Sequence, residues 1–391
     1  MTTHPFDAIT AEQLRDAGSM KWTAFPGTIG AWVAEMDFGT SPEVTAALHA
    51  AVDRAVFGYL PQALVTEMSG SYARFAADRY GWDVDPARVR PVSDVLTALE
   101  VVIAHYSRPG SPVILPTPAY MPFLTLPGTL GRDVIQVPMA VAEGPDGPRY
   151  TYDLDALDAA FAAGGHLLVL CNPHNPIGRV LTPDELRAIS EVVDRHGGRV
   201  FADEIHAPLT FAPHRHVPYA SLSATAAGHT VTATSASKAW NLPGLKCAQL
   251  VLSNDADVTT WKAVGHHAEM QAATLGLVAA AAAYDHSRDW LDDTVAYLAG
   301  NVRALADEVA RHVPDVAVTP LEGTYLSWLD CRKLDLGDAS SPAAYFREHA
   351  GVALTDGALC GEAGRGFVRL NLATPRPVLR EALTRMAGSL G

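Results

Sequence analysis

The sequence predicts an α/β fold: a large domain with a mainly parallel mixed sheet covered by helices on both faces, and a smaller α+β domain. Short apolar runs alternate with helical segments between residues 89 and 233, which is typical of parallel strands buried on both faces. The 391 residues suffice for one large and one small domain, and a hydrophobic content of 48% supplies a sizeable core.

The elements of the large domain follow from apolar runs and helix caps. Ser41 and Pro42 begin a helix as a hydroxyl cap and a proline in the first turn, and the Thr182–Glu185 segment supplies its own cap. We expect helices at 41–56, 64–80, 95–106, 120–126, 154–163 and 182–196, and strands at 89–92, 113–115, 134–137, 166–171, 199–202 and 230–233.

The C-terminal part changes character. We expect two long helical stretches at 255–285 and 288–312, then strands at 325–329 and 366–370 mixed with helices at 342–349 and 375–390. This pattern predicts three parts: an N-terminal arm (1–40) that packs on the small domain or on a partner, a large domain (41–285) and a small domain (286–391).

Composition limits the class of partner. A net charge of −14 argues against non-specific binding of nucleic acid. The N-terminus lacks the basic and apolar regions of a signal peptide, and the apolar stretch 272–283 is too short to cross a bilayer. Four scattered cysteines without a C-x-x-C pair indicate reduced core residues, so we expect a cytoplasmic protein without a metal site.

The stretch 229–247, HTVTATSASKAWNLPGLKC, carries the chemistry around which the chain is organised. A β-branched run leads into Ser235, Ser237 and Lys238, and a turn then leads to Lys246. A desolvated lysine has a lowered pKa and forms a Schiff base with a carbonyl. Hydroxyls and a second cation beside it suit a phosphate, so the stretch predicts a lysine that carries pyridoxal 5'-phosphate (PLP).

Two other interpretations of this stretch exist. A single lysine in a polar loop is usually solvated. Ser235 to Lys238 also fits the S-x-x-K signature of acyl-transferring serine enzymes. That signature requires its serine at a helix start and the companions S-D-N and K-T-G, but here a strand precedes the serine and neither companion occurs.

Polar residues end two further strands, and parallel strands place their carboxyl ends at one edge of the sheet. The run 171–178, CNPHNPIG, supplies Asn175, and the run 202–206, ADEIH, supplies Asp203 and His206. An aspartate can keep a pyridine nitrogen protonated, as PLP requires. Singly, these residues also fit a turn, a helix cap and a core histidine. Their occurrence at successive strand ends favours a cofactor site.

With these motifs the chain resembles the fold-type I PLP enzymes of the class I/II aminotransferase family. Within that family it is most similar to the MalY/PatB-like cystathionine β-lyase (C–S lyase) subgroup. The matching segments are WVAEMDF (32–38), FGY (57–59), TPAY (117–120), CNPHNPIG (171–178), ADEIH (202–206), SASKAWNLPGLK (235–246), EGTYLSW (322–328) and VRLNLA (368–373).

The resemblance implies roles around the cofactor ring. Lys238 would be the Schiff-base lysine and proton shuttle, and Asp203 would pair with the pyridinium nitrogen. Asn175 would lie beside the phenolic oxygen, with His206 close to the same edge. Tyr120 would stack on the ring face and take part in catalysis.

The resemblance also implies a phosphate site. Ser235, Ser237 and Lys246 would hold the phosphate together with the backbone amides of Val95 and Leu96. Lys246 stands where many aminotransferases have arginine.

Two further positions depart from the common family pattern. Asp94 stands in the phosphate-facing turn where relatives often have glycine, so we expect its carboxylate to point away or to cap the helix. Ile177 stands where many relatives have threonine, which removes a hydroxyl near the cofactor.

The remaining implied residues concern the substrate and a second subunit. Arg369 would bind the substrate α-carboxylate, a bidentate task that suits a guanidinium. Asn175 and Trp32 would contact the substrate as well. Tyr59 would bind the cofactor phosphate of the neighbouring subunit and contribute to catalysis there, which makes the protein a homodimer with shared sites.

The resemblance implies β-elimination from an L-cysteine S-conjugate such as cystathionine, giving a thiol, pyruvate and ammonia. An aminotransferase acting on an L-amino acid and a 2-oxo acid would use the same residues, and the motifs alone do not separate the two reactions. A PLP-binding regulatory protein is a third reading. The Lys238, Asp203 and Arg369 set argues against loss of catalysis.

Overall fold

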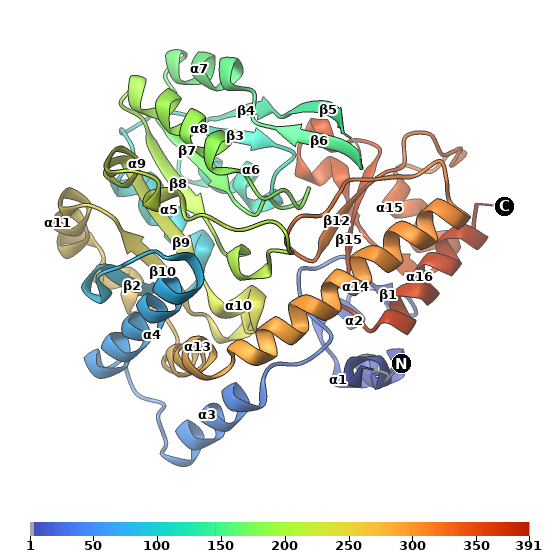
Figure 1. Ribbon diagram of the computed structural model, residues 1–391, viewed down its shortest axis with the longest axis horizontal. Coiled ribbons are helices and arrows are strands. Elements are labelled where there is room, and N and C mark those ends of the chain that lie inside the picture. The colour runs from blue at the N-terminus through green and yellow to red at the C-terminus, as the bar shows by residue number, and fades with distance from the viewer. Residues whose placement is uncertain (1–3, 145, 391) are drawn as a thin grey trace.

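The computed structural model describes residues 4–144 and 146–390, and its centre is a seven-stranded sheet (Figure 1). All neighbouring strands are parallel except β10, which runs antiparallel to both β2 and β9. The predicted mainly parallel mixed sheet is therefore confirmed. The strands, in order across the sheet, are β2 (Val89–Val92), β10 (Ala248–Leu252), β9 (Thr230–Thr234), β8 (Arg199–Asp203), β7 (Leu167–Cys171), β3 (Val113–Thr117) and β4 (Val134–Pro138).

Both faces of this sheet are buried because alternate residues of a strand point to opposite faces. Along β7, Leu168 and Leu170 join one core cluster, whereas Leu167 and Val169 join another. The first cluster is completed by α7 (Leu154–Ala162) and α8 (Pro183–Arg195), and the second by α5 (Val95–His105), α6 (Met121–Thr129) and α11 (Asp255–Val264).

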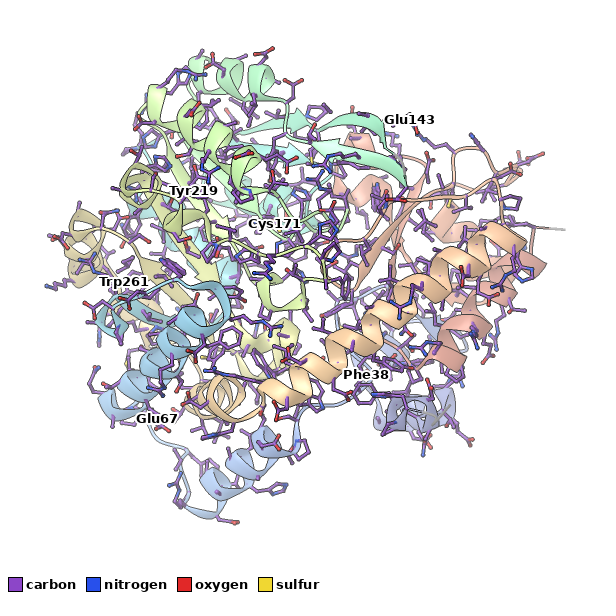
Figure 2. The ribbon with its side chains drawn as sticks, in the orientation of Figure 1. Phe38, Glu67, Glu143, Cys171, Tyr219 and Trp261 are labelled. Carbon is purple, nitrogen blue, oxygen red and sulfur yellow. The ribbon has the colours of Figure 1, made fainter. Side chains whose placement is uncertain are left out.

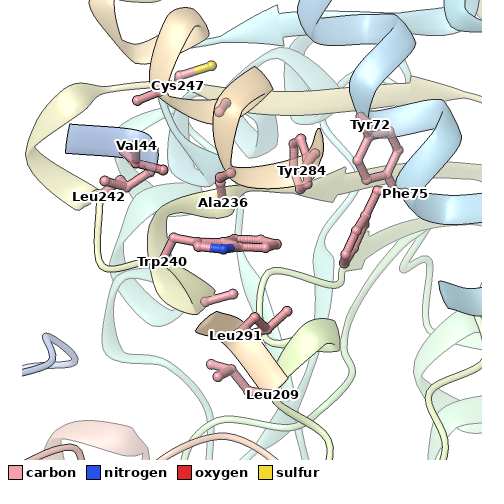
Figure 3. Close-up of a cluster of buried hydrophobic side chains, with 14 of the residues drawn as sticks. Val44, Tyr72, Phe75, Leu209, Ala236, Trp240, Leu242, Cys247, Tyr284 and Leu291 are labelled. Carbon is pink, nitrogen blue, oxygen red and sulfur yellow. The ribbon is translucent and has the colours of Figure 1, made fainter. Parts of the chain in front are cut away.

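A third cluster anchors the short helix that follows β9 (Figure 3). Trp240 is fully buried there, its indole N–H donates to the carbonyl of Ser287 at 3.0 Å, and its ring meets Phe75 and Tyr284 edge-on. Trp240 lies two residues after Lys238, so this packing holds the backbone of that lysine. The helices of the cluster are α3 (Pro42–Asp53), α4 (Gln62–Tyr80), α10 (Ala236–Ala239), α13 (Thr274–His286) and the first half of α14 (Arg288–His312).

The C-terminal part is built on a four-stranded antiparallel sheet beside α14 and α16 (Figure 1). The expected boundaries at residues 40 and 285 stay predictions. The elements are β11 (Ala317–Val318), β12 (Leu326–Asp330), β15 (Phe367–Asn371), β14 (Thr355–Asp356), α14 (Arg288–His312), α15 (Pro342–Tyr345), the π-helical turn η6 (Phe346–Ala350) and α16 (Arg376–Gly388).

The 25-residue helix α14 is amphipathic rather than apolar all round. Leu291, Leu298 and Leu305 are buried at a spacing of seven residues, which places them on one face. Among the described residues, no helix is both long and apolar enough to span a membrane.

The N-terminal segment, whose first three residues lie outside the described range, is attached to the C-terminal part. Strand β1 (Ile29–Gly30) pairs in parallel with β13 (Val352–Ala353), after α1 (Ala11–Ala17) and α2 (Met20–Thr23). Lys21 and Asp37 form a buried ion pair at 2.8 Å, and the ammonium of Lys21 also donates to the carbonyls of Glu35 and Ala373. The strand pairing and the Lys21 contacts therefore hold residues 21–37 against the C-terminal part.

The prediction of one helical stretch over 255–285 is wrong. The chain forms three helices there: α11, α12 (His266–Glu269) and α13. Gly265 packs so closely on the Trp261 ring that an added Cβ would lie 2.2 Å from it. After α12 the backbone extends at Ala273, whose N–H donates to the carbonyl of Lys246 at 3.0 Å. The break thus supports the turn that carries Lys246.

Besides the two-residue strands β1, β11, β13 and β14, two longer strand features were not predicted. Strand β10 lies between β2 and β9 and is fully buried. Its residues form a continuous apolar run apart from Gln249, which is the signal that identified the other strands. The hairpin of β5 (Ala140–Gly144) and β6 (Gly147–Thr151) is mostly exposed and lacks such a run.

We predict that Asp37→Ala lowers the free energy of unfolding by about 3–5 kcal/mol, because it leaves the Lys21 ammonium buried without a counter-charge. Asp292→Ala is the matched control, since the Arg79–Asp292 pair is exposed and is worth less than about 1 kcal/mol. Chemical denaturation followed by circular dichroism measures both variants. Equal losses would contradict this role of the buried pair.

Candidate functional site

A cavity of about 190 Å³ lies at the carboxyl ends of β7, β8 and β9. All of the cofactor-binding residues predicted from the sequence line it, except Tyr59. The lining residues are Ala34, Ser93, Asp94, Val95, Leu96, Tyr120, Asn175, Asp203, Ile205, His206, Ser235, Ser237, Lys238, Pro243, Lys246 and Cys247.

Lys238 extends from α10 into this cavity and donates a hydrogen bond from Nζ to the carbonyl of Ala34 at 2.8 Å. Burial lowers the pKa of its ammonium to about 8, and the positive charge of Arg369 acts in the same direction. Lys238 therefore loses its proton at a lower pH than a solvated lysine and becomes a nucleophilic amine.

Asp203 is a buried carboxylate without a cationic partner. Its Oδ1 accepts the N–H of Ile205 at 3.2 Å, and Cys171 donates from Sγ to Oδ2 at 3.6 Å. Figure 2 shows Cys171 in the middle of the view. Burial raises the pKa of Asp203 to about 6. Among the described residues Asp203 forms no ion pair, so its charge lacks the partner that a buried charge normally has.

Arg369 presents the opposite situation. Its side chain on β15 is 2% exposed, and its guanidinium donates to Asn175 Oδ1 at 3.0 Å, to the carbonyl of Trp32 at 2.9 Å and to Thr355 Oγ1 at 3.2 Å. Among the described residues its Nε has no hydrogen-bond partner, and burial lowers the pKa of the guanidinium. In the part of the chain that the structure describes, no carboxylate pairs with this cation, which leaves it suited to an anionic ligand.

His206 and Tyr120 lie around the same cavity as uncharged polar groups. Nδ1 of His206 is buried without a hydrogen-bond partner in the described part of the chain, and burial holds the imidazole pKa well below its usual range. The ring packs edge-on against Tyr325, whose hydroxyl donates to the carbonyl of Ala34 at 3.1 Å. Burial also raises the pKa of Tyr120, so its hydroxyl stays protonated.

The N-terminus of α5 forms another end of the cavity, where Val95 and Leu96 lie. Asp94 caps this helix by accepting the N–H of Thr97 at 2.9 Å. This is one of the two arrangements that we expected for Asp94 from the sequence. Its other oxygen accepts from Lys246 Nζ at 3.0 Å. Burial alone would raise the pKa of Asp94, but these hydrogen bonds and the Lys246 charge outweigh it and lower that pKa.

The two serines next to Lys238 are placed differently from each other. Ser235 Oγ donates to the carbonyl of Cys247 at 2.7 Å and accepts the N–H of Ser237 at 3.0 Å. A hydroxyl has one hydrogen to donate, so Ser235 mainly holds the turn in this arrangement. Ser237 lines the cavity at the start of the short helix α10.

Three predicted site residues lie outside the cavity lining: Arg369, which contacts the lining residue Asn175, and Tyr59 and Trp32. Tyr59 is 92% exposed on the loop between α3 and α4. The Trp32 indole N–H donates to the carbonyl of Lys21 at 3.1 Å, and Trp32 reaches Arg369 only through its main-chain oxygen. The substrate role of Trp32 and the partner role of Tyr59 stay predictions.

Comparison with known proteins identifies the family. Residues 33–386 match the family model described as aminotransferase class I and II. The chain belongs to this family. A cystathionine beta-lyase of Corynebacterium glutamicum is 38% identical over 97% of this chain and 98% of its own length. Cystathionine beta-lyase PatB of Bacillus subtilis is 30% identical over 92% of each protein. A Corynebacterium diphtheriae crystal structure, assigned as a PLP-dependent β-cystathionase, has a TM-score of 0.91 at 41% identity and 98% coverage of both chains.

These matches confirm the resemblance to the class I/II aminotransferase family and to its cystathionine β-lyase subgroup. Two contacts in this family member were missed by sequence reasoning: the Ala34 carbonyl on Lys238 and the Cys171 thiol on Asp203. Ala34 lies in the motif WVAEMDF and Cys171 in CNPHNPIG. Their place in these motifs is the sequence signal that could have indicated the two contacts.

We predict that reductive trapping of a small aldehyde on Lys238 rises with pH around a midpoint near 8. Below that pH the ammonium is protonated and cannot attack, and above it the amine is free. Arg369→Gln should move the midpoint upward, because it removes a positive charge that disfavours the ammonium. Mass spectrometry of the Lys238 peptide after borohydride reduction measures the profile. A midpoint near that of a solvated lysine, about 10.4, would contradict this assignment.

Proposed function

We propose that the protein is a PLP-dependent carbon–sulfur lyase that acts on L-cysteine S-conjugates such as cystathionine and releases a thiol, pyruvate and ammonia. The carrying observation is that one cavity joins a buried anion, Asp203, and a desolvated amine, Lys238, while the buried cation Arg369 contacts the lining residue Asn175. C–S cleavage is chosen over transamination because relatives along nearly the full chain are named cystathionine beta-lyases.

The donor set fits PLP. A protonated pyridine nitrogen is the cation that the buried Asp203 carboxylate lacks, and the amine of Lys238 suits the cofactor aldehyde. Asn175 and the unpartnered Nδ1 of His206 offer polar groups for the phenolic oxygen, and Tyr120 offers an aromatic face. These five residues would hold the ring.

The other end of the cavity suits the phosphate. The first amides of α5, at Val95 and Leu96, carry the positive end of the helix dipole, which favours an anion. Lys246 supplies a cation, and Ser237 supplies a hydroxyl with Ser235 behind it.

The reaction then follows from what these side chains do. When bound, PLP withdraws electrons from the substrate Cα and so makes its proton acidic. Arg369 would hold the substrate carboxylate, which orients the Cα–H bond toward Lys238. The Lys238 amine would remove that proton, and Asp203 would keep a proton on the ring nitrogen meanwhile. Departure of the thiolate at Cβ completes the elimination and leaves 2-aminoacrylate, which water hydrolyses to pyruvate and ammonia.

We also propose a homodimer with shared sites in the cytoplasm. Phe57 is 64% exposed and Tyr59 is 92% exposed on one loop, and large exposed aromatic side chains suit burial against a second copy. The four cysteines are buried and unpaired, as suits a reducing compartment.

We predict that the purified protein, given PLP and L-cystathionine without a 2-oxo acid, releases thiol and pyruvate in equal amounts over many turnovers. Lys238→Ala should lower the rate by about 10³-fold or more, because no other buried amine lines the described cavity. A coupled assay follows both products. Turnover that depends on a 2-oxo acid, without thiol release, would instead make the protein an aminotransferase.

Shared sites predict complementation between two inactive variants. Tyr59→Ala and Lys238→Ala should each lose activity, whereas their mixture after subunit exchange should regain about a quarter of the wild-type rate, because half of the dimers would contain one intact site. The activity of the mixture measures this. A mixture as inactive as its components would place Tyr59 outside the site.

A further inference from the structure

The phosphate end of the cavity contains a carboxylate where an anion is expected to bind. Asp94 and Lys246 both line the cavity, and they form an ion pair at 3.0 Å with side chains that are 37% and 57% exposed. Apart from Lys238, the described lining of the cavity holds no lysine or arginine besides Lys246. The charge that Lys246 offers to a phosphate is therefore offset by Asp94.

We propose that Asp94 weakens binding of the cofactor phosphate at this site, because its carboxylate competes with the phosphate for Lys246. Bound PLP then exchanges more readily than it would if residue 94 carried no negative charge. This inference rests on the proposed cofactor. A phosphate placed among Val95, Leu96 and Lys246 would meet the negative charge of Asp94 nearby, and like charges oppose each other.

The helix cap alone does not require this negative charge. Asparagine caps helices as well as aspartate does, through the same kind of side-chain oxygen. Asp94 accepts the Thr97 N–H through Oδ1 and binds Lys246 through Oδ2, so the two roles use different oxygens. Asp94→Asn would keep the hydrogen bond to the Thr97 N–H and would remove the negative charge that pairs with Lys246.

The test compares cofactor affinity rather than turnover. Apo-protein is titrated with PLP and with pyridoxal, which lacks the phosphate, and binding is followed by visible absorbance and tryptophan fluorescence. Asp153→Asn is the matched control: Asp153 caps α7 through the same 2.9 Å contact, to the N–H of Ala156, and does not line the cavity.

We expect Asp94→Asn to bind PLP about two- to fivefold more tightly than the wild type, in the range of a partly exposed charge interaction. Pyridoxal affinity should stay unchanged in both variants, and Asp153→Asn should match the wild type. The gain should shrink as ionic strength rises, because salt screens exposed charges. A purely structural role for Asp94 would show none of this ligand or salt dependence.

Unchanged or weaker PLP binding by Asp94→Asn would overturn the inference, as would an equal gain for pyridoxal. Failure of the proposed function has a different signature. If the wild-type protein binds no PLP, the proposed function and this inference are both wrong. If the wild type binds PLP and cleaves cystathionine, and Asp94→Asn binds PLP equally well, only the inference is wrong.

Discussion

The active-site cavity and its surroundings depend on two charged side chains that are buried without a partner of opposite charge in the described part of the chain. Asp203 is 4% exposed and Arg369 is 2% exposed, and neither has an opposite charge within ion-pair distance among the described residues. Such groups cost free energy in the folded state, and the surrounding layers must outweigh that cost. Two helical layers and the fully buried Trp240 provide this framework, which holds Lys238 half-buried in the cavity. Desolvation is in turn the main reason that the pKa of Lys238 falls.

The parallel sheet explains why these groups lie together. In the register of β7, β8 and β9, Cys171 lies beside Asp203, and Asp203 lies beside Ala233, five residues before Lys238. Arg369 comes from the other sheet, on β15, and meets this row through Asn175. The two sheets thus supply the opposite charges, and their contact sets the distance between them.

The strand ends were predictable from the sequence because continuous apolar runs identify buried strands and parallel strands end at one edge. Asn175, Asp203 and Lys238 could be assigned to one site for this reason. The Ala34 carbonyl could not, since a main-chain oxygen has no side-chain signature. The extended backbone at Ala273, which separates α12 from α13, is held by a hydrogen bond to the carbonyl of Lys246, which is a tertiary effect. The role of Tyr59 depends on where a second chain binds. Local sequence patterns do not encode that position.

The N-terminal segment contacts the site almost entirely through its backbone. Carbonyl oxygens of residues 32 and 34 bind Arg369 and Lys238, and those of residues 33 and 35 bind Asn371. A carbonyl keeps its position when its side chain is replaced, provided that the backbone path is held, as the Lys21–Asp37 pair holds it. The hydrogen bonds to Arg369 and Lys238 therefore do not depend on which side chains stand at 32 and 34, although the charge of Glu35 also acts on Lys238. During evolution, this separation would let substrate preference diverge while the chemistry is retained.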